Sequence, residues 1–104
     1  MNEHEFLYLT TTGWKSKNPH EIEIWFVEHE GRFYLISEKR ERAHWVQNIR
    51  RHSAVAFRVG DQTFKGIARA VDDDDEEELV HRIWTLMDKK YQWSTGLIVQ
   101  LTAK

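Results

Sequence analysis

The sequence contains no cysteine and a single proline in its 104 residues. Without cysteine the chain forms no disulfide framework, and it offers no thiolate nucleophile and no cysteine-based metal site. Its longest apolar runs are about four residues, far short of the ~20 that a membrane-spanning helix needs. The first five residues contain no cationic stretch leading into an apolar run, so we expect no secretory signal. These absences predict a cytoplasmic protein with no membrane partner.

Common catalytic and metal-binding motifs are also missing. The six histidines include no pair at zinc-site spacing on a predicted helix, and there is no Gly-x-Ser-x-Gly motif and no Walker loop. We interpret Glu28-His29-Glu30 as a solvated hairpin tip, and the acids from Asp72 to Glu78 as a helix start rather than a calcium loop. The sequence therefore predicts no metal site, and it identifies no catalytic residue.

The chain is rich in large hydrophobic side chains, and most of its length is basic. It is 40% hydrophobic, with five Trp, five Phe and three Tyr, which suffices for the core of a single domain over residues 1–104. The net charge of −2 hides an uneven distribution, because seven of the 17 acids form the run from Asp72 to Glu78. The rest of the chain carries ten acids against 15 Lys and Arg, and this basic body suits an anionic ligand.

Hydrophobic periodicity predicts a mainly β chain with two helices. Alternating or wholly apolar segments indicate strands at 6–11, 21–27, 33–36, 54–59, 63–71 and 97–101. Apolar residues at helical spacing indicate helices at 41–51 and 72–90, the second with acids at its start and lysines at its end. The predicted order is β-β-β-α-β-β-α-β. Because short turns join the strands, we expect antiparallel pairing in a small barrel.

A polar turn follows the first predicted strand. Residues 10–17 place two lysines, a serine and three threonines around Gly13. Ammonium groups, hydroxyls and the amides of a glycine turn are donors that hold a phosphate. An ordinary polar turn has the same composition, and the segment alone does not decide between the two interpretations.

A basic segment covers residues 37–51, at the junction of a predicted strand and a predicted helix. Cations beside the start of a helix favour an anion. Taken alone, a basic and solvated helix face explains this segment better than a binding site does.

Considered together, the two segments resemble the deazaflavin-dependent nitroreductase and quinone reductase family. The family's first motif, Thr-Thr-Gly-Arg-Lys-Ser-Gly, reads Thr-Thr-Gly-Trp-Lys-Ser-Lys over residues 11–17. The family's Trp three residues before an Asn-Leu pair is similar to Trp45 before Asn48-Ile49. A valine-rich strand that ends at Gly60 and a closing Tyr91-Gln92-Trp93 segment are also similar. The resemblance covers nearly the whole chain.

The resemblance implies a split β-barrel of the FMN-binding type, the group that includes pyridoxamine-phosphate-oxidase-like flavoproteins. It implies a deazaflavin coenzyme of the F-420 type, with FMN as the alternative, because Trp45 stands where FMN-binding relatives commonly have a basic residue. The implied activity is hydride transfer between the reduced cofactor and a small organic substrate of the quinone or nitro class.

The resemblance also assigns residues to the cofactor, with the polar turn at its phosphate and the basic segment beside its ring or tail. The implied cofactor-binding residues are Thr11, Thr12, Gly13, Lys15, Ser16, Lys17, Ser37, Lys39, Arg42, Trp45 and Asn48. Two of the motif positions depart from the family, since Trp14 replaces an Arg and Lys17 replaces a Gly.

Two other functions use the same residues. A non-catalytic flavin-binding or carrier protein would bind through the same segments without a substrate pocket. A small barrel that binds nucleic acid could use the basic stretch 39–51, but the acid run repels a polyanion, and we expect no nucleic-acid partner. Tyr8 and Tyr34 could each donate a proton, although barrel positions explain both better. The five Trp are compatible with a homodimer and equally with a monomer core.

Overall fold

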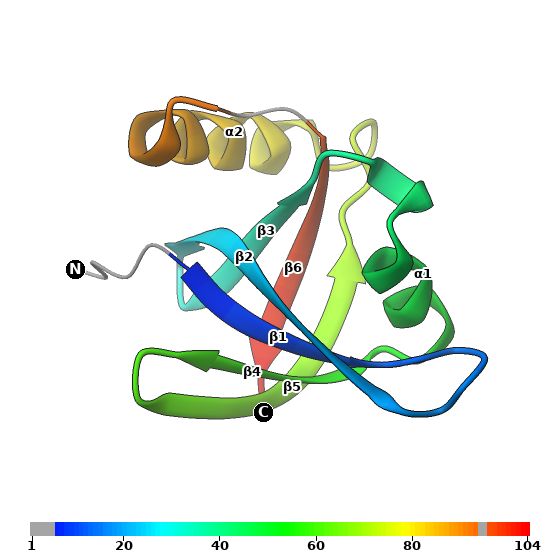
Figure 1. The fold of residues 1–104 in the computed structure, drawn as a ribbon. Helices are drawn as coiled ribbons and strands as arrows, with labels where there is room; N and C mark the ends of the chain where they lie inside the picture. Colours follow the sequence, from blue (N-terminus) through cyan, green and yellow to red (C-terminus); the bar gives the residue numbers. More distant parts are fainter. Residues whose placement is uncertain (1–5, 94–95) are drawn as a thin grey trace.

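The computed structural model describes residues 6–93 and 96–104, which form a closed barrel of six antiparallel strands (Figure 1). The strands are β1 (Phe6–Thr12), β2 (Pro19–His29), β3 (Arg32–Ser37), β4 (Ala54–Val59), β5 (Gln62–Ala70) and β6 (Leu97–Ala103). Around the barrel their order is β1-β2-β3-β6-β5-β4. Between the strands lie a short 3-10 helix η1 (Arg40–Arg42), α1 (His44–Arg51) and α2 (Glu77–Tyr91). The predicted mainly β barrel, with its two helices in the predicted order, is confirmed.

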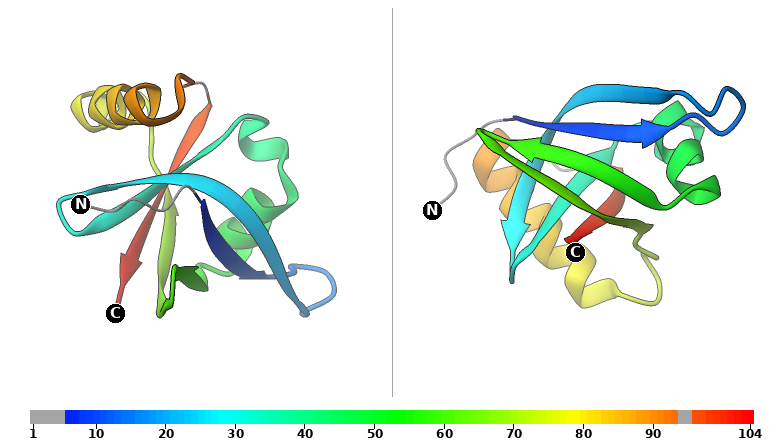
Figure 2. Two further views of the ribbon diagram at one scale, coloured as in Figure 1. Left: turned by 60° about the vertical axis from the view of Figure 1, so that its left-hand side comes forward. Right: turned by 90° about the horizontal axis from the view of Figure 1, so that it is seen from below.

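Two apolar clusters, one on each face of the sheet, hold the fold together. The cluster inside the barrel is closed at one end by α1, which contributes Val46 and Ile49. On the outside, α2 lies across the barrel and packs Val80, Ile83 and Met87 against residues of β3 and β6 (Figures 1 and 2). Strand β3 is therefore buried on both faces, which explains why its sequence is an apolar run without alternation. No helix in the described ranges is long and apolar enough to cross a membrane.

Strand β2 divides its length between two partners. Its residues 19–25 pair with β1, and its residues 26–29 pair with β3. The β1–β2 hairpin also projects beyond β4, because the pairing of β1 with β4 covers residues 8–10 of β1. Figure 2 shows the tip of this hairpin beside α1. The divided strand leaves a gap between the projecting hairpin and the η1–α1 segment.

The second helix is shorter than the sequence predicts. It begins at Glu77 rather than at Asp72, because the Asp72 side chain stabilises a turn instead. Asp72 Oδ1 accepts hydrogen bonds from the backbone N–H groups of Asp74 and Asp75, at 2.8 and 3.0 Å. Aspartate commonly competes with helical hydrogen bonding in this way. At its other end the helix continues to Tyr91, within the segment predicted as a loop.

The first predicted helix, at 41–51, is interrupted. Ala43 has an extended backbone with ψ 136°, and it separates η1 from α1. The interruption turns the chain, so that residues of η1 and α1 face the gap beside β2 from two directions. The predicted strand bounds differ from those observed by at most two residues at either end.

Replacing Gly66 with Ala tests the closure of the barrel by β5 and β6. Gly66 pairs with Ala103, and a Cβ at position 66 would collide with the backbone carbonyl of Thr102. We expect the variant to lose about 1–3 kcal/mol of unfolding free energy in urea denaturation. Thr63→Ala, at an exposed position of the same strand, is the control with little expected change. If the two variants are equally stable, a Cβ at position 66 does not collide with the Thr102 carbonyl.

The pair formed by Arg69 and Glu76 predicts a pH dependence of stability. Arg69 donates hydrogen bonds of 2.6 and 3.0 Å to the Glu76 carboxylate, and these bonds lower the pKa of Glu76 below its ordinary value. A carboxyl whose pKa is lowered by folding stabilises the fold above its unfolded pKa of about 4.3, and loses this effect as the pH falls through its folded pKa. Wild type should therefore exceed Glu76→Gln in unfolding free energy at neutral pH, with a difference that shrinks on acidification. A difference that is constant with pH would contradict the pairing.

Candidate cofactor site

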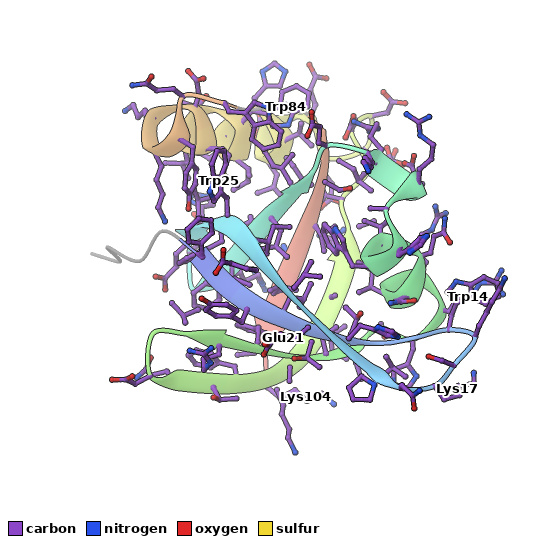
Figure 3. The ribbon with its side chains drawn as sticks, in the orientation of Figure 1. Trp14, Lys17, Glu21, Trp25, Trp84 and Lys104 are labelled. Carbon is purple, nitrogen blue, oxygen red and sulfur yellow. The ribbon has the colours of Figure 1, made fainter. Side chains whose placement is uncertain are left out.

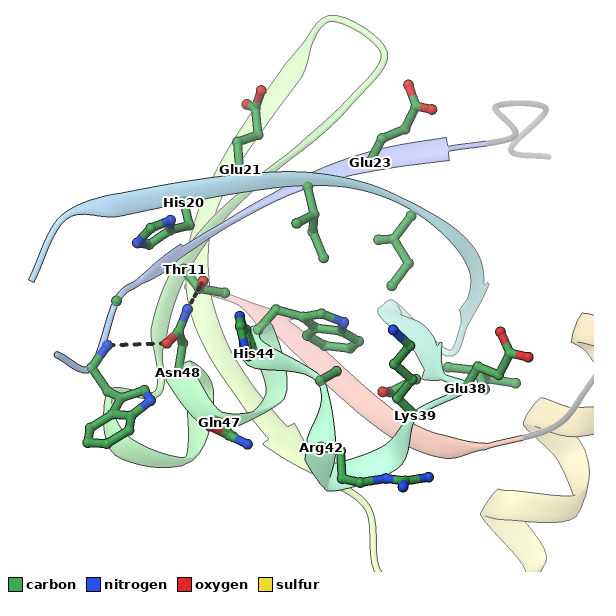
Figure 4. A pocket seen from close by; sticks show the side chains of 18 of the residues that line it. Thr11, His20, Glu21, Glu23, Glu38, Lys39, Arg42, His44, Gln47 and Asn48 are labelled. Carbon is green, nitrogen blue, oxygen red and sulfur yellow. Dashed lines mark hydrogen bonds between the residues drawn. The ribbon is translucent and has the colours of Figure 1, made fainter. Parts of the chain in front are cut away.

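A cavity of about 1200 Å³ occupies the gap between β2 and the η1–α1 segment (Figure 4). Most of its lining comes from the β1–β2 turn, from β2 and from the chain between Ile36 and Asn48, and Phe6, Thr11 and Trp93 complete it. The cavity exists because residues 19–25 of β2 have a strand neighbour on one side alone in the described chain. It exceeds the roughly 300–1,000 Å³ of common ligand pockets, so it has room for a cofactor together with a second small molecule.

The turn after β1 is compact and depends on Gly13. The Gly13 N–H donates to the Asn18 carbonyl at 2.8 Å, and the Lys17 N–H donates to the Gly13 carbonyl at the same distance. A Cβ on Gly13 would collide with the Ser16 hydroxyl and the His20 ring. Lys17 has a φ of 63°, in the left-handed region that favours glycine. The turn thus keeps a glycine-like backbone at the position where the resembling family has glycine.

Asn48 joins this turn to α1. Its side chain is buried, with 6% of its surface exposed. Oδ1 accepts a hydrogen bond from the Trp14 backbone N–H at 3.2 Å, and Nδ2 donates to Thr11 Oγ1 at 3.0 Å (dashed in Figure 4). One amide therefore fixes the end of β1, the start of the turn and the helix relative to one another.

The two ends of the cavity differ in chemistry. At the turn end lie the Lys15 ammonium and the Ser16 hydroxyl, which is 3.3 Å from His20 Nε2. At the other end Trp25 stacks on Tyr91 with ring centroids 4.5 Å apart. Figure 3 places Trp14 and Trp25 far apart in the molecule, one at each end of the cavity. A long ligand with an anionic end and a flat, partly apolar body would match a cavity that is polar at one end and aromatic at the other.

The walls between the two ends are apolar inside and charged at the opening. Trp45 is half-buried and packs against the core inside the barrel, and it forms one wall. Lys39 and Arg42 are exposed at the opening. Glu21 and Glu23 of β2 also line the cavity, and in Figure 4 their carboxylates lie on the other side of the β2 ribbon from Asn48. The charged side chains that the turn and η1 add to the lining, Lys15 and Arg42, are therefore positive, whereas Glu21, Glu23 and Glu38 add negative charge from β2 and from the end of β3.

The structure brings most of the predicted site residues together. The cavity is lined by Thr11, Gly13, Lys15, Ser16, Ser37, Lys39, Arg42, Trp45 and Asn48. Thr12 and Lys17 are not among its lining residues. Ser37 is buried, and its hydroxyl donates to the Arg40 carbonyl at 2.9 Å, so it holds η1 in place. The binding role of all eleven residues stays a prediction.

Several lining residues were missed by sequence reasoning. His20 lies at the turn because the hairpin register pairs it with Thr11, a register that the sequence does not reveal. Trp25 begins an apolar run and was interpreted as part of a strand, without a site role. His44 and Trp93 also line the cavity, and nothing in their sequence context indicates it.

The two tyrosines considered as proton donors lie elsewhere in the barrel. Tyr8 OH donates to Glu23 Oε2 at 2.8 Å, and this hydrogen bond raises the pKa of Tyr8. Tyr34 is buried in the cluster beneath α2, and its hydroxyl accepts a hydrogen bond from Gln100 Nε2 at 3.0 Å. Neither residue lines the cavity.

Comparison with known proteins identifies the family. The sequence model of the F420H(2)-dependent quinone reductase family matches residues 1–102. The chain belongs to this family. The predicted deazaflavin cofactor is thereby confirmed, and the chain is a deazaflavin-dependent reductase. No curated protein is significantly similar to this quinone reductase family member in sequence.

Solved structures agree with the split-barrel fold of this family member. An F420-H2 dependent reductase, FDR-A, has a TM-score of 0.73 and 20% identity, with 93% of each chain covered. A candidate pyridoxamine 5′-phosphate oxidase from Listeria innocua has a TM-score of 0.76 and 17% identity, with 98% of this chain and 86% of that chain covered. A structure described as a domain-swapped dimer has a TM-score of 0.68 and 17% identity, with 97% and 81% covered.

The residues of the cavity fit the deazaflavin cofactor. The Lys15 ammonium and the Ser16 hydroxyl lie at a tight turn that has no room for a Cβ at Gly13, and donors of this kind suit a phosphate. The apolar wall around Trp45 suits a flat ring system. The order of the two features along the cavity matches a ligand that is anionic at one end.

Replacing Asn48 with Ala tests the link between the turn and α1. The change leaves the Thr11 hydroxyl and the Trp14 N–H without their partner, so we expect a loss of about 1–3 kcal/mol of unfolding free energy. Hydrogen exchange at the Trp14 amide should become faster. Gln47→Ala is the matched control, since the Gln47 side chain makes one exposed hydrogen bond of 3.4 Å from the same helix. Unchanged exchange at Trp14 in Asn48→Ala would show that the amide does not hold the turn.

Proposed function

We propose that this protein reduces a small quinone or nitro compound with the hydride of a reduced deazaflavin. The observation that carries the proposal is the cavity, which combines an anion-binding turn with an apolar wall and has room for two ligands. The bound cofactor supplies the hydride, and the protein supplies position and a dry surface. The single unit of residues 1–104 forms the whole cofactor-binding domain in this proposal.

Binding begins at the turn. The Lys15 ammonium and the Ser16 hydroxyl hold the cofactor phosphate, with the backbone fixed by Asn48. Lys39 and Arg42 at the opening attract the anionic cofactor and steer it into the cavity. Thr12 and Lys17 have a smaller role, because they lie outside the lining.

Trp45 would form the wall that holds the ring system of the cofactor. Trp45, Ala43 and Ile24 exclude water from one face of the ring. The acceptor occupies the remaining volume, so that it meets the ring inside the cavity. Orientation of the two rings is what the protein contributes to the rate. A similar structure is described as a domain-swapped dimer, and on that basis we include a homodimer in the proposal.

Cofactor titration tests the proposal. Quenching of Trp fluorescence should show tighter binding of the deazaflavin than of FMN, since Trp14, Trp25, Trp45 and Trp93 line the cavity. Lys15→Gln should weaken deazaflavin binding about tenfold, the size of one charge-assisted hydrogen bond. Lys65→Gln is the control, at an exposed position of β5. Oxidation of the reduced deazaflavin by quinone and by nitro acceptors then identifies the substrate class.

Each outcome separates the alternatives. Tight deazaflavin binding without turnover of either acceptor class would favour a carrier protein. Preference for FMN would move the protein to the oxidase-like branch of the fold. Failure to bind either cofactor would overturn the proposed function.

A further inference from the structure

Trp14 stands where the resembling family has arginine, and the structure places two cations at its ring. The Lys15 Nζ lies 4.9 Å from the ring centroid, and the Arg51 Cζ lies 4.8 Å from it. Arg51 is the last residue of α1, 37 positions along the chain from Trp14. In Figure 3 Trp14 lies at the edge of the molecule beside α1. A guanidinium is thus present at this turn although the motif arginine is not.

The position of Arg51 is fixed by the same helix that holds the turn. Asn48 and Arg51 are three residues apart, so they lie on one face of α1. Asn48 binds the Trp14 backbone, and Arg51 contacts the Trp14 ring. A cation over an aromatic ring is attracted to the negative face of the ring. Backbone and ring of Trp14 are therefore both anchored to α1.

Lys15 and Arg51 both lie close to the Trp14 ring, and two like charges near one ring favour an anion beside it. Among the described residues, ion pairs join His29 to Glu30, Arg40 to Asp73 and Arg69 to Glu76. Within that part of the chain, neither Lys15 nor Arg51 is paired with a carboxylate. Mutual repulsion of the two cations falls when an anion binds, and this gain adds to the affinity.

We propose that Arg51 is an anion-binding residue that replaces the missing arginine of the turn motif, with Trp14 as the residue that positions it. The ligand is a phosphate group, and on the proposed function this is the phosphate of the deazaflavin. Arg51 extends the anion site from the turn onto the end of α1. Arg51 is not itself among the residues that line the cavity, but it contacts the ring of Trp14, which does line it, so its guanidinium would meet the anion at the edge of the cavity beside that ring.

A simpler role for Arg51 is to interact with the negative end of the helix dipole. Arg50 has the same opportunity, because it is also in the last turn of α1 and is exposed. Within the described residues, Arg51 and not Arg50 lies over the Trp14 ring. Arg50→Gln is therefore the matched control for Arg51→Gln, with equal loss of charge on the same helix end.

Inorganic phosphate provides a test that does not need the cofactor. We expect phosphate to shift the indole N–H signal of Trp14 in NMR spectra, with a dissociation constant at least threefold higher in Arg51→Gln. Arg50→Gln should titrate as wild type does. No phosphate-dependent shift at Trp14 in wild type, or equal effects of the two arginine variants, would overturn the proposal. Urea denaturation of each variant verifies that it is folded.

Deazaflavin titration gives the second test. Arg51→Gln should weaken binding about tenfold, and Trp14→Arg in the Arg51→Gln background should restore most of it, because the arginine returns to its motif position. If the folded double variant does not recover deazaflavin binding, Arg51 does not replace the motif arginine. If wild type binds no deazaflavin but phosphate binds in an Arg51-dependent way, the proposed function fails and the anion site stands. If the cofactor binds tightly and independently of Arg51, this proposal fails and the proposed function stands.

Discussion

The buried amide of Asn48 is the interaction on which the site depends. Residues 11–20 form a hairpin tip that extends beyond the reach of β4, so the barrel itself does not hold it. Asn48 supplies the missing support by satisfying one backbone group and one side chain of the tip at once. A buried polar side chain that has a partner for its oxygen and for its nitrogen favours a single arrangement of its neighbours. The positions of Lys15 and Lys17 in the turn depend on this arrangement.

Helix α1 serves the core and the site with different residues. Val46 and Ile49 close one end of the barrel core, so the helix cannot shift without exposing apolar surface. Trp45 faces the cavity from the same short helix. Eight residues thus couple the stability of the barrel to the shape of the ligand cavity. Such a rigid support suits a reaction in which the protein mainly sets the distance between two bound molecules.

Much of the fold could be predicted because its elements follow simple periodic patterns. The alternation in β2 and the apolar run of β3 report burial on one face and on two faces. The start of α2 was mispredicted because acids that suit a helix dipole also form side-chain turns, and Asp72 does the latter. Composition does not decide between these two uses of aspartate.

The site could be predicted in outline, because the resemblance to the family assigned both Gly13 and Asn48 to one cofactor site. Its remaining residues depend on strand register and on the division of β2 between two neighbours. These are long-range pairings that leave no local trace in the sequence, and His20 and Trp25 enter the cavity through them. The cations at Trp14 likewise come together through helix packing.

The divided strand has a consequence for how the molecule behaves among copies of itself. An unpaired strand edge is a template on which another chain can add a strand, and the stretch 19–25 has such an edge in the described structure. This stretch begins with Pro19, which has no N–H to donate, and it carries Glu21 and Glu23. Both features discourage edge-to-edge aggregation. The unpaired edge of β2 can therefore remain accessible to a ligand without acting as a template for aggregation.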